Sequence, residues 1–150
     1  MGKALWMGAL ALGGALAGQG IAGQGMAGQA APMTGTQSGV FTEAQAAEGA
    51  VVYGERCAMC HGKSAEGTWE VPPLKGKFLA NWGKAPVVSL FDYLGHAMPQ
   101  FAPGTLSPQD NVRLIAFLLK ANGAPAGAKP LSEDRAGLGA IRIDGAAAVK

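Results

Sequence analysis

The sequence has little net charge and lacks most of the patterns that mark an enzyme. Twelve Lys and Arg face ten Asp and Glu, and the formal net charge of +2 is too small to indicate nucleic acid or an anionic membrane surface as a partner. No paired carboxylates, Ser–His arrangement or phosphate-binding glycine loop offers a catalytic centre. Cysteine is scarce too, with two among 150 residues, so few side chains are candidates for a reactive or metal-binding site.

Long hydrophobic runs are missing as well, and the N-terminal apolar stretch covers only residues 4–17. It follows Lys3, which is the only charged residue among the first 30. This run is too short and glycine-rich to span a bilayer, but it has the length of a signal-peptide h-region. Small residues at 28–30 fit a signal-peptidase site; a cut after Ala17 and an uncleaved anchor with a flexible stalk are the alternatives. We predict that residues 1–30 are a signal peptide and low-complexity linker, that the protein is periplasmic, and that the mature chain spans no membrane.

The remaining residues divide into three segments. These are a flexible lead-in at 31–41, a domain at 42–123 and a C-terminal extension at 124–150. The extension is rich in Ala, Gly and Pro, and only residues 138–143 are apolar enough to pack on the domain. No alternating strand pattern occurs in any segment, so the predicted fold class is all-α.

Within the domain, apolar spacing and capping residues predict short helices joined by long loops. We place them at about 43–56, near 77–82, at 87–95 and at 108–121. Thr42 with Gln45 forms a capping box, and Ser107 followed by Pro108 favours a helix start. Three or four short helices make a thin core at this size, so we expect a bulky apolar group to complete it.

The two cysteines lie three residues apart, and a histidine follows the second. The stretch Cys57-Ala58-Met59-Cys60-His61 has the spacing of a c-type haem attachment site. Two thiols at this spacing on a helical turn reach the two vinyl groups on one porphyrin edge, and the next residue points its imidazole at the iron from the same side. We predict one covalently bound haem c, attached through Cys57 and Cys60, with His61 as the proximal iron ligand.

Three other interpretations of this motif fit the sequence less well. A thioredoxin-type redox pair requires a βαβ context, which the sequence lacks. A zinc site requires about four ligands, and outside the motif the chain offers only His96 and carboxylates. A structural disulfide between residues three apart would be strained and would close almost no loop.

The other face of the iron needs a ligand or must be open. Met98 and His96 are the candidates, and Met98 is favoured because Pro99 stiffens the loop and removes a competing amide donor. A thioether opposite a histidine raises the reduction potential, which suits an electron carrier, whereas His96 would lower it. We therefore predict an electron carrier that is not itself an enzyme. An open or labile sixth position would instead indicate a haem enzyme or a gas sensor.

Over residues 42–123 the chain resembles the class I c-type cytochromes. The family's Gly-x-x-x-aromatic step is matched by Gly49 and Tyr53, its Leu-x-x-aromatic step by Leu114 and Phe117, and its Pro-x-Leu motif by residues 72–74. The resemblance implies a small cytochrome c fold around one haem, in which the first and last helices cross at these residues. It also implies that the Pro72 carbonyl accepts a hydrogen bond from Nδ1 of His61.

More narrowly, several short motifs are similar to cytochromes c that accompany quinoprotein (PQQ) alcohol dehydrogenases. They lie at residues 72–76, 78–82, 90–93, 98–99 and 122–123. This similarity implies redox partner proteins, with a periplasmic quinoprotein dehydrogenase as donor and a terminal oxidase or another cytochrome as acceptor. It also implies that an indole, Trp82 rather than Trp69, hydrogen-bonds a haem propionate, with core packing as the alternative.

Four basic residues lie close together in the sequence after the haem motif. They are Lys63, Lys75, Lys77 and Lys84. Around the haem edge they would steer an acidic partner, with rates that fall as salt rises. A merely solvated lysine face is the alternative.

Overall fold

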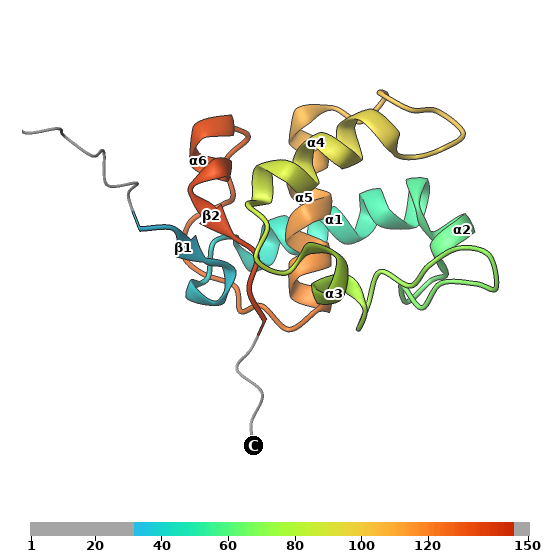
Figure 1. The fold of residues 1–150 in the computed structure, drawn as a ribbon. Coiled ribbons are helices and arrows are strands. Elements are labelled where there is room, and N and C mark those ends of the chain that lie inside the picture. Colours follow the sequence, from blue (N-terminus) through green and yellow to red (C-terminus); the bar gives the residue numbers. More distant parts are fainter. Residues whose placement is uncertain (1–31, 146–150) are drawn as a thin grey trace, which may run out of the picture. The chain divides into compact units, whose positions relative to one another are not determined.

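The computed structural model describes residues 32–145, which form six helices, a 3₁₀ turn and a pair of two-residue strands (Figure 1). In chain order these are β1 (Thr34–Gly35), η1 (Thr36–Ser38), α1 (Glu43–Arg56), α2 (Ala58–His61), α3 (Phe78–Trp82), α4 (Val87–Ala97), α5 (Pro108–Ala121), α6 (Arg135–Gly139) and β2 (Ile141–Arg142). The predicted helical class is confirmed. The predicted signal peptide lies outside the described residues, and no described helix is long and apolar enough to cross a bilayer.

The two longest helices begin where their capping residues place them. The Thr42 hydroxyl accepts a hydrogen bond from the Gln45 amide (3.1 Å) at the start of α1. The Ser107 hydroxyl accepts one from the Asp110 amide (3.0 Å) at the start of α5. Each bond satisfies one of the amides that the first turn of a helix leaves without a partner. α4 runs to Ala97, two residues beyond its predicted end, and so includes His96 in its last turn.

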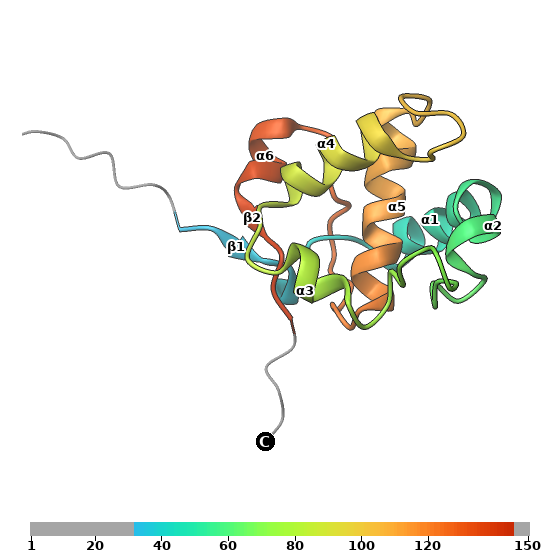
Figure 2. The same ribbon diagram turned by 45° about the vertical axis from the view of Figure 1, so that its right-hand side comes forward.

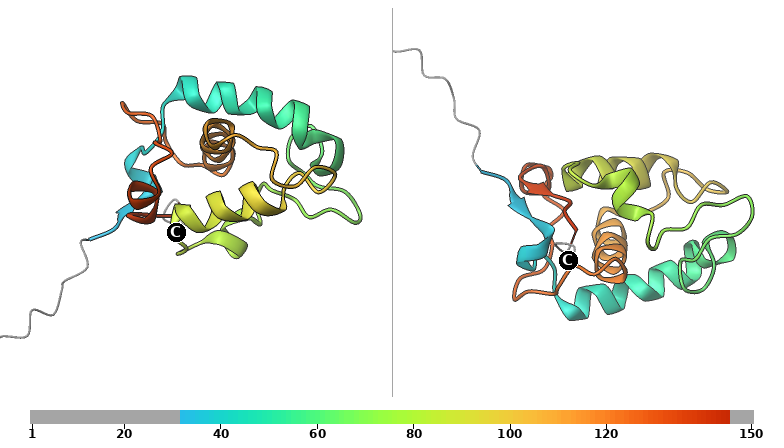
Figure 3. Two further views of the ribbon diagram at one scale, coloured as in Figure 1. Left: turned by 90° about the horizontal axis from the view of Figure 1, so that it is seen from above. Right: turned by 60° about the horizontal axis from the view of Figure 1, so that its bottom comes forward.

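α1 and α5 cross at closest approach where α1 carries Gly49. A Cβ atom at this position would lie 1.9 Å from the backbone oxygen of Arg113 on α5. Close to the crossing, the rings of Tyr53 and Phe117 pack with centroids 4.8 Å apart. The crossing that the class I resemblance implied is therefore present. α5 lies between α1 and α4 and contributes more buried core residues than any other described element (Figure 3).

Residues 32–41 of the lead-in, which we expected to be flexible, are ordered and partly buried. β1 pairs in parallel with β2, with Thr34 opposite Ile141, and the side chains of Thr36 and Phe41 are fully buried. The partner strand lies more than 100 residues away, so no local pattern could reveal the pairing. The apolar stretch at 138–143 packs on the domain as predicted, and α6 lies beside α4 (Figure 2).

Asp144 joins the two ends of the described chain. One oxygen of its carboxylate accepts hydrogen bonds from the Thr36 hydroxyl (2.8 Å) and the Gln37 amide (2.9 Å). We expect Asp144→Ala to lower the free energy of unfolding by about 1–3 kcal/mol, because the Gln37 amide loses its acceptor in a half-buried place and the Thr36 hydroxyl keeps only the backbone carbonyl of Asp144 (3.0 Å). Urea unfolding of the haem-loaded protein measures this change. Glu133→Ala, at an exposed position, should stay within about 0.5 kcal/mol of the wild type; equal values for the two variants would contradict the role of Asp144.

Candidate haem site

A cavity of about 720 Å³ lies at the place where the C-terminal end of α1 meets α2. Its volume falls in the range of about 300–1,000 Å³ that is typical of cofactor sites. All the longer helices and two loops contribute to its walls, which are mostly apolar. The lining includes Cys57, Cys60, His61, Pro72, Leu74, Phe78, Trp82, Leu90, Leu94, Met98, Leu114 and Leu118.

The haem motif spans the junction between α1 and α2. Cys57 ends α1, and α2 then carries Cys60 and His61, with the His61 amide bonded to the Cys57 carbonyl (2.9 Å). Both cysteine side chains line the cavity. Burial raises the pKa of the Cys57 thiol to about 11. A thiol that stays protonated at neutral pH is unlike the activated cysteine of a thioredoxin-type pair.

His61 is buried, with 9% of its surface exposed, and its ring is fixed by one contact. Nδ1 lies 3.0 Å from the carbonyl oxygen of Pro72. With Nδ1–H donating to this oxygen, the lone pair of Nε2 remains available to a metal. The contact that the class I resemblance implied is therefore present.

The two candidates for the sixth ligand lie in different surroundings. Met98 is half-buried at the end of α4 and lines the same cavity as His61. His96 is exposed, does not line the cavity, and places its Nδ1 2.8 Å from the backbone oxygen of Asp92. The structure thus brings Met98, and not His96, to the cavity of the proximal histidine.

Of the tryptophans and lysines that the sequence analysis named as candidates, only one lines the cavity. Trp82 lines the cavity and packs against Tyr93, with ring centroids 5.3 Å apart, whereas Trp69 is fully exposed and lies outside the lining. The four lysines at 63, 75, 77 and 84 are exposed, and none of them lines the cavity.

Sequence reasoning missed Arg56, which also lines the cavity. Its Nη2 donates a hydrogen bond to the Thr105 hydroxyl (2.6 Å), and its Nε is buried without a protein partner. The bond joins the end of α1 to the loop that follows Met98. The one sequence signal for this role is the position of Arg56 directly before Cys57.

The residues that line the cavity fit a covalently bound haem. Two thiols and an imidazole with a free Nε2 lie on one side, and a thioether is available from α4. The apolar walls include core residues of α4 and α5, so a bulky apolar group in this place would complete the thin core.

Tyr53 secures the backbone next to the proximal histidine, because its hydroxyl donates a hydrogen bond to the Gly62 carbonyl (2.7 Å). Burial above all raises the pKa of Tyr53 from 10.0 to about 12, and the negative charge of Glu66 adds to the rise. The unfolded chain therefore loses this proton at lower pH than the folded protein. Its contribution to stability is complete below pH 10.0 and is lost as the pH rises to about 12.

We expect the free energy of unfolding to fall across this alkaline range, and to fall less steeply in Tyr53→Phe. The variant should also be about 1 kcal/mol less stable at neutral pH, because the bond to Gly62 is lost. Urea unfolding at a series of pH values measures both effects. Parallel pH profiles for the two proteins would contradict the assignment.

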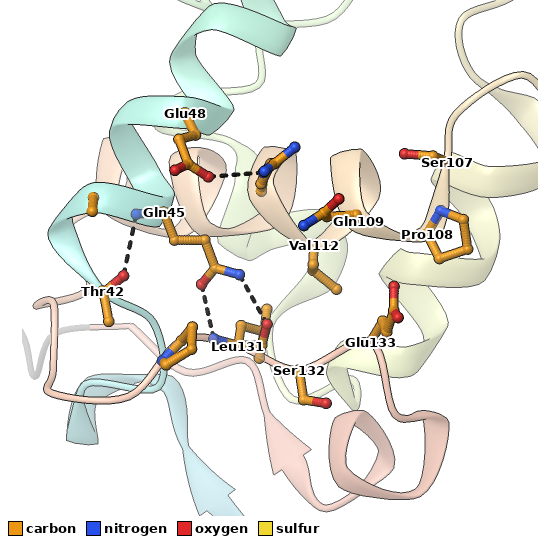
Figure 4. Close-up of a pocket in the computed structure, with 13 residues that line it drawn as sticks. Thr42, Gln45, Glu48, Ser107, Pro108, Gln109, Val112, Leu131, Ser132 and Glu133 are labelled. Carbon is orange, nitrogen blue, oxygen red and sulfur yellow. Dashed lines mark hydrogen bonds and ion pairs between the residues drawn. The ribbon is translucent and has the colours of Figure 1, made fainter.

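A second cavity, of about 690 Å³, lies where the first turns of α1 and α5 face residues 130–133 (Figure 4). Its central polar groups already pair with each other. The Gln45 side chain exchanges two hydrogen bonds of 2.8 Å with the backbone of Leu131, and Glu48 pairs with Arg113 (2.8 Å). The residues that line this second cavity include no cysteine, histidine or methionine, in contrast to the cavity at the haem motif.

Comparison with protein families confirms the predicted small cytochrome c fold. The family model described as "Cytochrome C oxidase, cbb3-type, subunit III" matches residues 44–118. A thiosulfate dehydrogenase of Stutzerimonas stutzeri (strain A1501) is 33% identical over 79 residues, which are 48% of this chain and 26% of the relative. The chain thus spans about a quarter of the length of this curated relative. Among solved structures, the sulfane dehydrogenase SoxCD from Paracoccus pantotrophus matches 53% of this chain and 44% of its own, with 32% identity and a TM-score of 0.45.

Proposed function

Because the chain belongs to the family of c-type cytochrome domains described as subunit III of cbb3-type cytochrome c oxidase, we propose that it carries one electron at a time between redox proteins, with His61 and Met98 as the two iron ligands of its haem c. The observation that carries this proposal is the common cavity of Cys57, Cys60, His61 and Met98. A haem that is attached at one edge and ligated from two sides would use all four side chains.

In this function the bound haem supplies the one-electron chemistry of its iron. The protein supplies attachment, orientation and a dry pocket. Cys57 and Cys60 would hold one edge of the haem. The Pro72 carbonyl accepts the Nδ1 proton of His61, which would leave the lone pair of Nε2 for the iron. The apolar side chains of α4 and α5 exclude water. A fixed ligand pair in such surroundings leaves little to reorganise when the charge changes by one.

The ferric spectrum separates this proposal from its rival, a haem enzyme or gas sensor. We expect a low-spin iron with the weak far-red band of a methionine ligand, and slow uptake of carbon monoxide after reduction. A high-spin ferric iron that binds carbon monoxide readily when reduced would support an open sixth position and contradict the carrier assignment.

We further propose that the electron donor is a periplasmic dehydrogenase and that a terminal oxidase or another cytochrome accepts the electron. Two donor classes have support. The short motifs between residues 72 and 123 are similar to cytochromes of quinoprotein alcohol dehydrogenases, whereas the 33% identity is to a thiosulfate dehydrogenase. Stopped-flow reduction by each enzyme with its substrate discriminates between them. The true donor should reduce the protein in a saturable reaction, and both rates equal to the enzyme-free rate would exclude both classes.

The proposed location follows from residues 1–30, which have the features of a signal peptide. We expect haem-stained protein in the periplasmic fraction of cells that express the full chain. Removal of residues 2–30 should leave the protein in the cytoplasm without haem; haem attachment in that variant would contradict export by this segment.

A further inference from the structure

The geometry points to Asn122 as a positioning residue for the proximal iron ligand: we propose that its side chain holds the loop at 72–76, so that the Pro72 carbonyl stays in place to orient His61. The inference rests on the proposed role of His61 as an iron ligand. It concerns a residue that does not line the cavity and that entered the sequence analysis only within the short motif at 122–123.

The Asn122 side chain makes three hydrogen bonds, two of them to the loop at 72–76. Nδ2 donates to the carbonyl of Leu74 (2.8 Å), and Oδ1 accepts from the amide of Gly76 (2.9 Å). Nδ2 also donates to the carbonyl of Leu118 on α5 (2.8 Å). Both donor hydrogens and the acceptor oxygen are therefore in use. Through this one amide, α5 is joined to a loop that lies more than 40 residues earlier in the chain.

The helix end does not require this side chain. The Gly123 amide bonds to the Lys120 carbonyl (3.0 Å) and the Ala124 amide to the Leu119 carbonyl (3.0 Å). Gly123 takes the positive φ of +90° that this type of helix end needs. Asn122 itself has φ −105° and ψ 19°, which other residue types adopt readily. The helix end would therefore form without the side-chain amide of Asn122, whose bonds to Leu74 and Gly76 hold the loop instead.

The loop depends on outside contacts for its position, because Pro72 and Pro73 have no N–H groups with which to anchor it. On one side the amides of Leu74 and Lys75 both bond to the carbonyl of Ala65 (2.9 and 3.0 Å). On the other side the loop is held by Asn122. The Pro72 carbonyl that receives Nδ1–H of His61 lies two residues before the anchored Leu74.

Loss of the Asn122 bonds should therefore loosen the contact between Pro72 and His61. A weaker bond at Nδ1 makes the imidazole a poorer electron donor, which favours the ferrous iron and raises the reduction potential. The Nδ1 proton should also exchange with solvent faster, by roughly tenfold if about one hydrogen bond's net free energy is lost.

The test uses the full, haem-loaded protein and two variants of Asn122. Asn122→Leu removes all three bonds, whereas Asn122→Asp keeps an acceptor for the Gly76 amide and loses the donor to Leu74. Thr42→Ala serves as the matched control. It removes the cap of α1 (3.1 Å) and should lower the stability of the protein, but it leaves the loop at 72–76 untouched.

The readouts are the exchange rate of the His61 Nδ1 proton in D₂O, followed by NMR, and the reduction potential. We expect exchange roughly tenfold faster and a raised potential in Asn122→Leu, a smaller change of the same sign in Asn122→Asp, and wild-type values in Thr42→Ala. If Asn122→Leu fails to fold, Asn122→Asp carries the same comparison.

Wild-type exchange and potential in a destabilised Asn122 variant would overturn the positioning role and leave the proposed function intact. A wild-type protein in which the His61 ring protons show no shift from a neighbouring iron would instead overturn the ligand assignment, and the positioning role with it. The two failures are thus distinguishable in one set of spectra.

Discussion

Met98→Ala should abolish the weak far-red band of the ferric protein and lower its reduction potential. Met98 lies at the C-terminal end of α4 and lines the cavity into which His61 points. Alanine has no sulfur, so the sixth position falls to water or stays open. A thioether favours the ferrous state more than water does, so the loss of the thioether should lower the reduction potential. The reduced variant should also bind carbon monoxide much faster than the wild type.

The matched control for this prediction is His96→Ala. His96 is exposed and its Nδ1 contacts its own helix at the Asp92 carbonyl (2.8 Å), so the band and the potential should be unchanged. Ferric spectra and carbon monoxide binding of the two variants decide the matter. A band that survives in Met98→Ala would show that the assignment is wrong, and a low-spin spectrum lost only in His96→Ala would identify histidine as the sixth ligand.

Gly49→Ala should have the largest effect on stability. The added Cβ would lie 1.9 Å from the backbone oxygen of Arg113 and 3.0 Å from Cβ of Phe117. A helix backbone cannot yield locally without breaking its own hydrogen bonds, so α1 and α5 must move apart. That movement also disturbs the contact between Tyr53 and Phe117 (4.8 Å). We expect a loss of about 3 kcal/mol or more in the free energy of unfolding, together with a lower yield of haem-loaded protein.

Gly54 provides the control on the same helix. A Cβ at Gly54 would meet nothing within 4 Å, so Gly54→Ala should stabilise the protein by about 0.5–1 kcal/mol through helix propensity alone. Urea unfolding of both haem-loaded variants measures the difference. Equal stabilities would contradict the close helix crossing as the reason for the glycine.

The features that could be predicted from sequence depend on residues close together in the chain. The starts of α1 and α5 follow from Thr42 and Ser107, whose hydroxyls bond to amides three residues on. The haem motif at 57–61 is local in the same sense. The crossing at Gly49 required more than local spacing, and it was reached through resemblance to a family whose helices cross there.

The features that were missed depend on partners far apart in the chain. The lead-in is ordered because Thr36 and Gln37 bond to Asp144, more than 100 residues later. The bond from Arg56 to Thr105 and the bonds from Asn122 to Leu74 and Gly76 span more than 40 residues. A polar side chain gives no sign in the sequence of which distant backbone group it will meet, so such contacts emerge only with the fold.

The most direct test of the central claim is the intact mass of the full chain after maturation in an exporting host, measured under denaturing conditions and after treatment with a thiol alkylating reagent. The account predicts the mass of the exported polypeptide plus one haem, with neither Cys57 nor Cys60 alkylated. A polypeptide without added haem, alkylated at both cysteines, would contradict it.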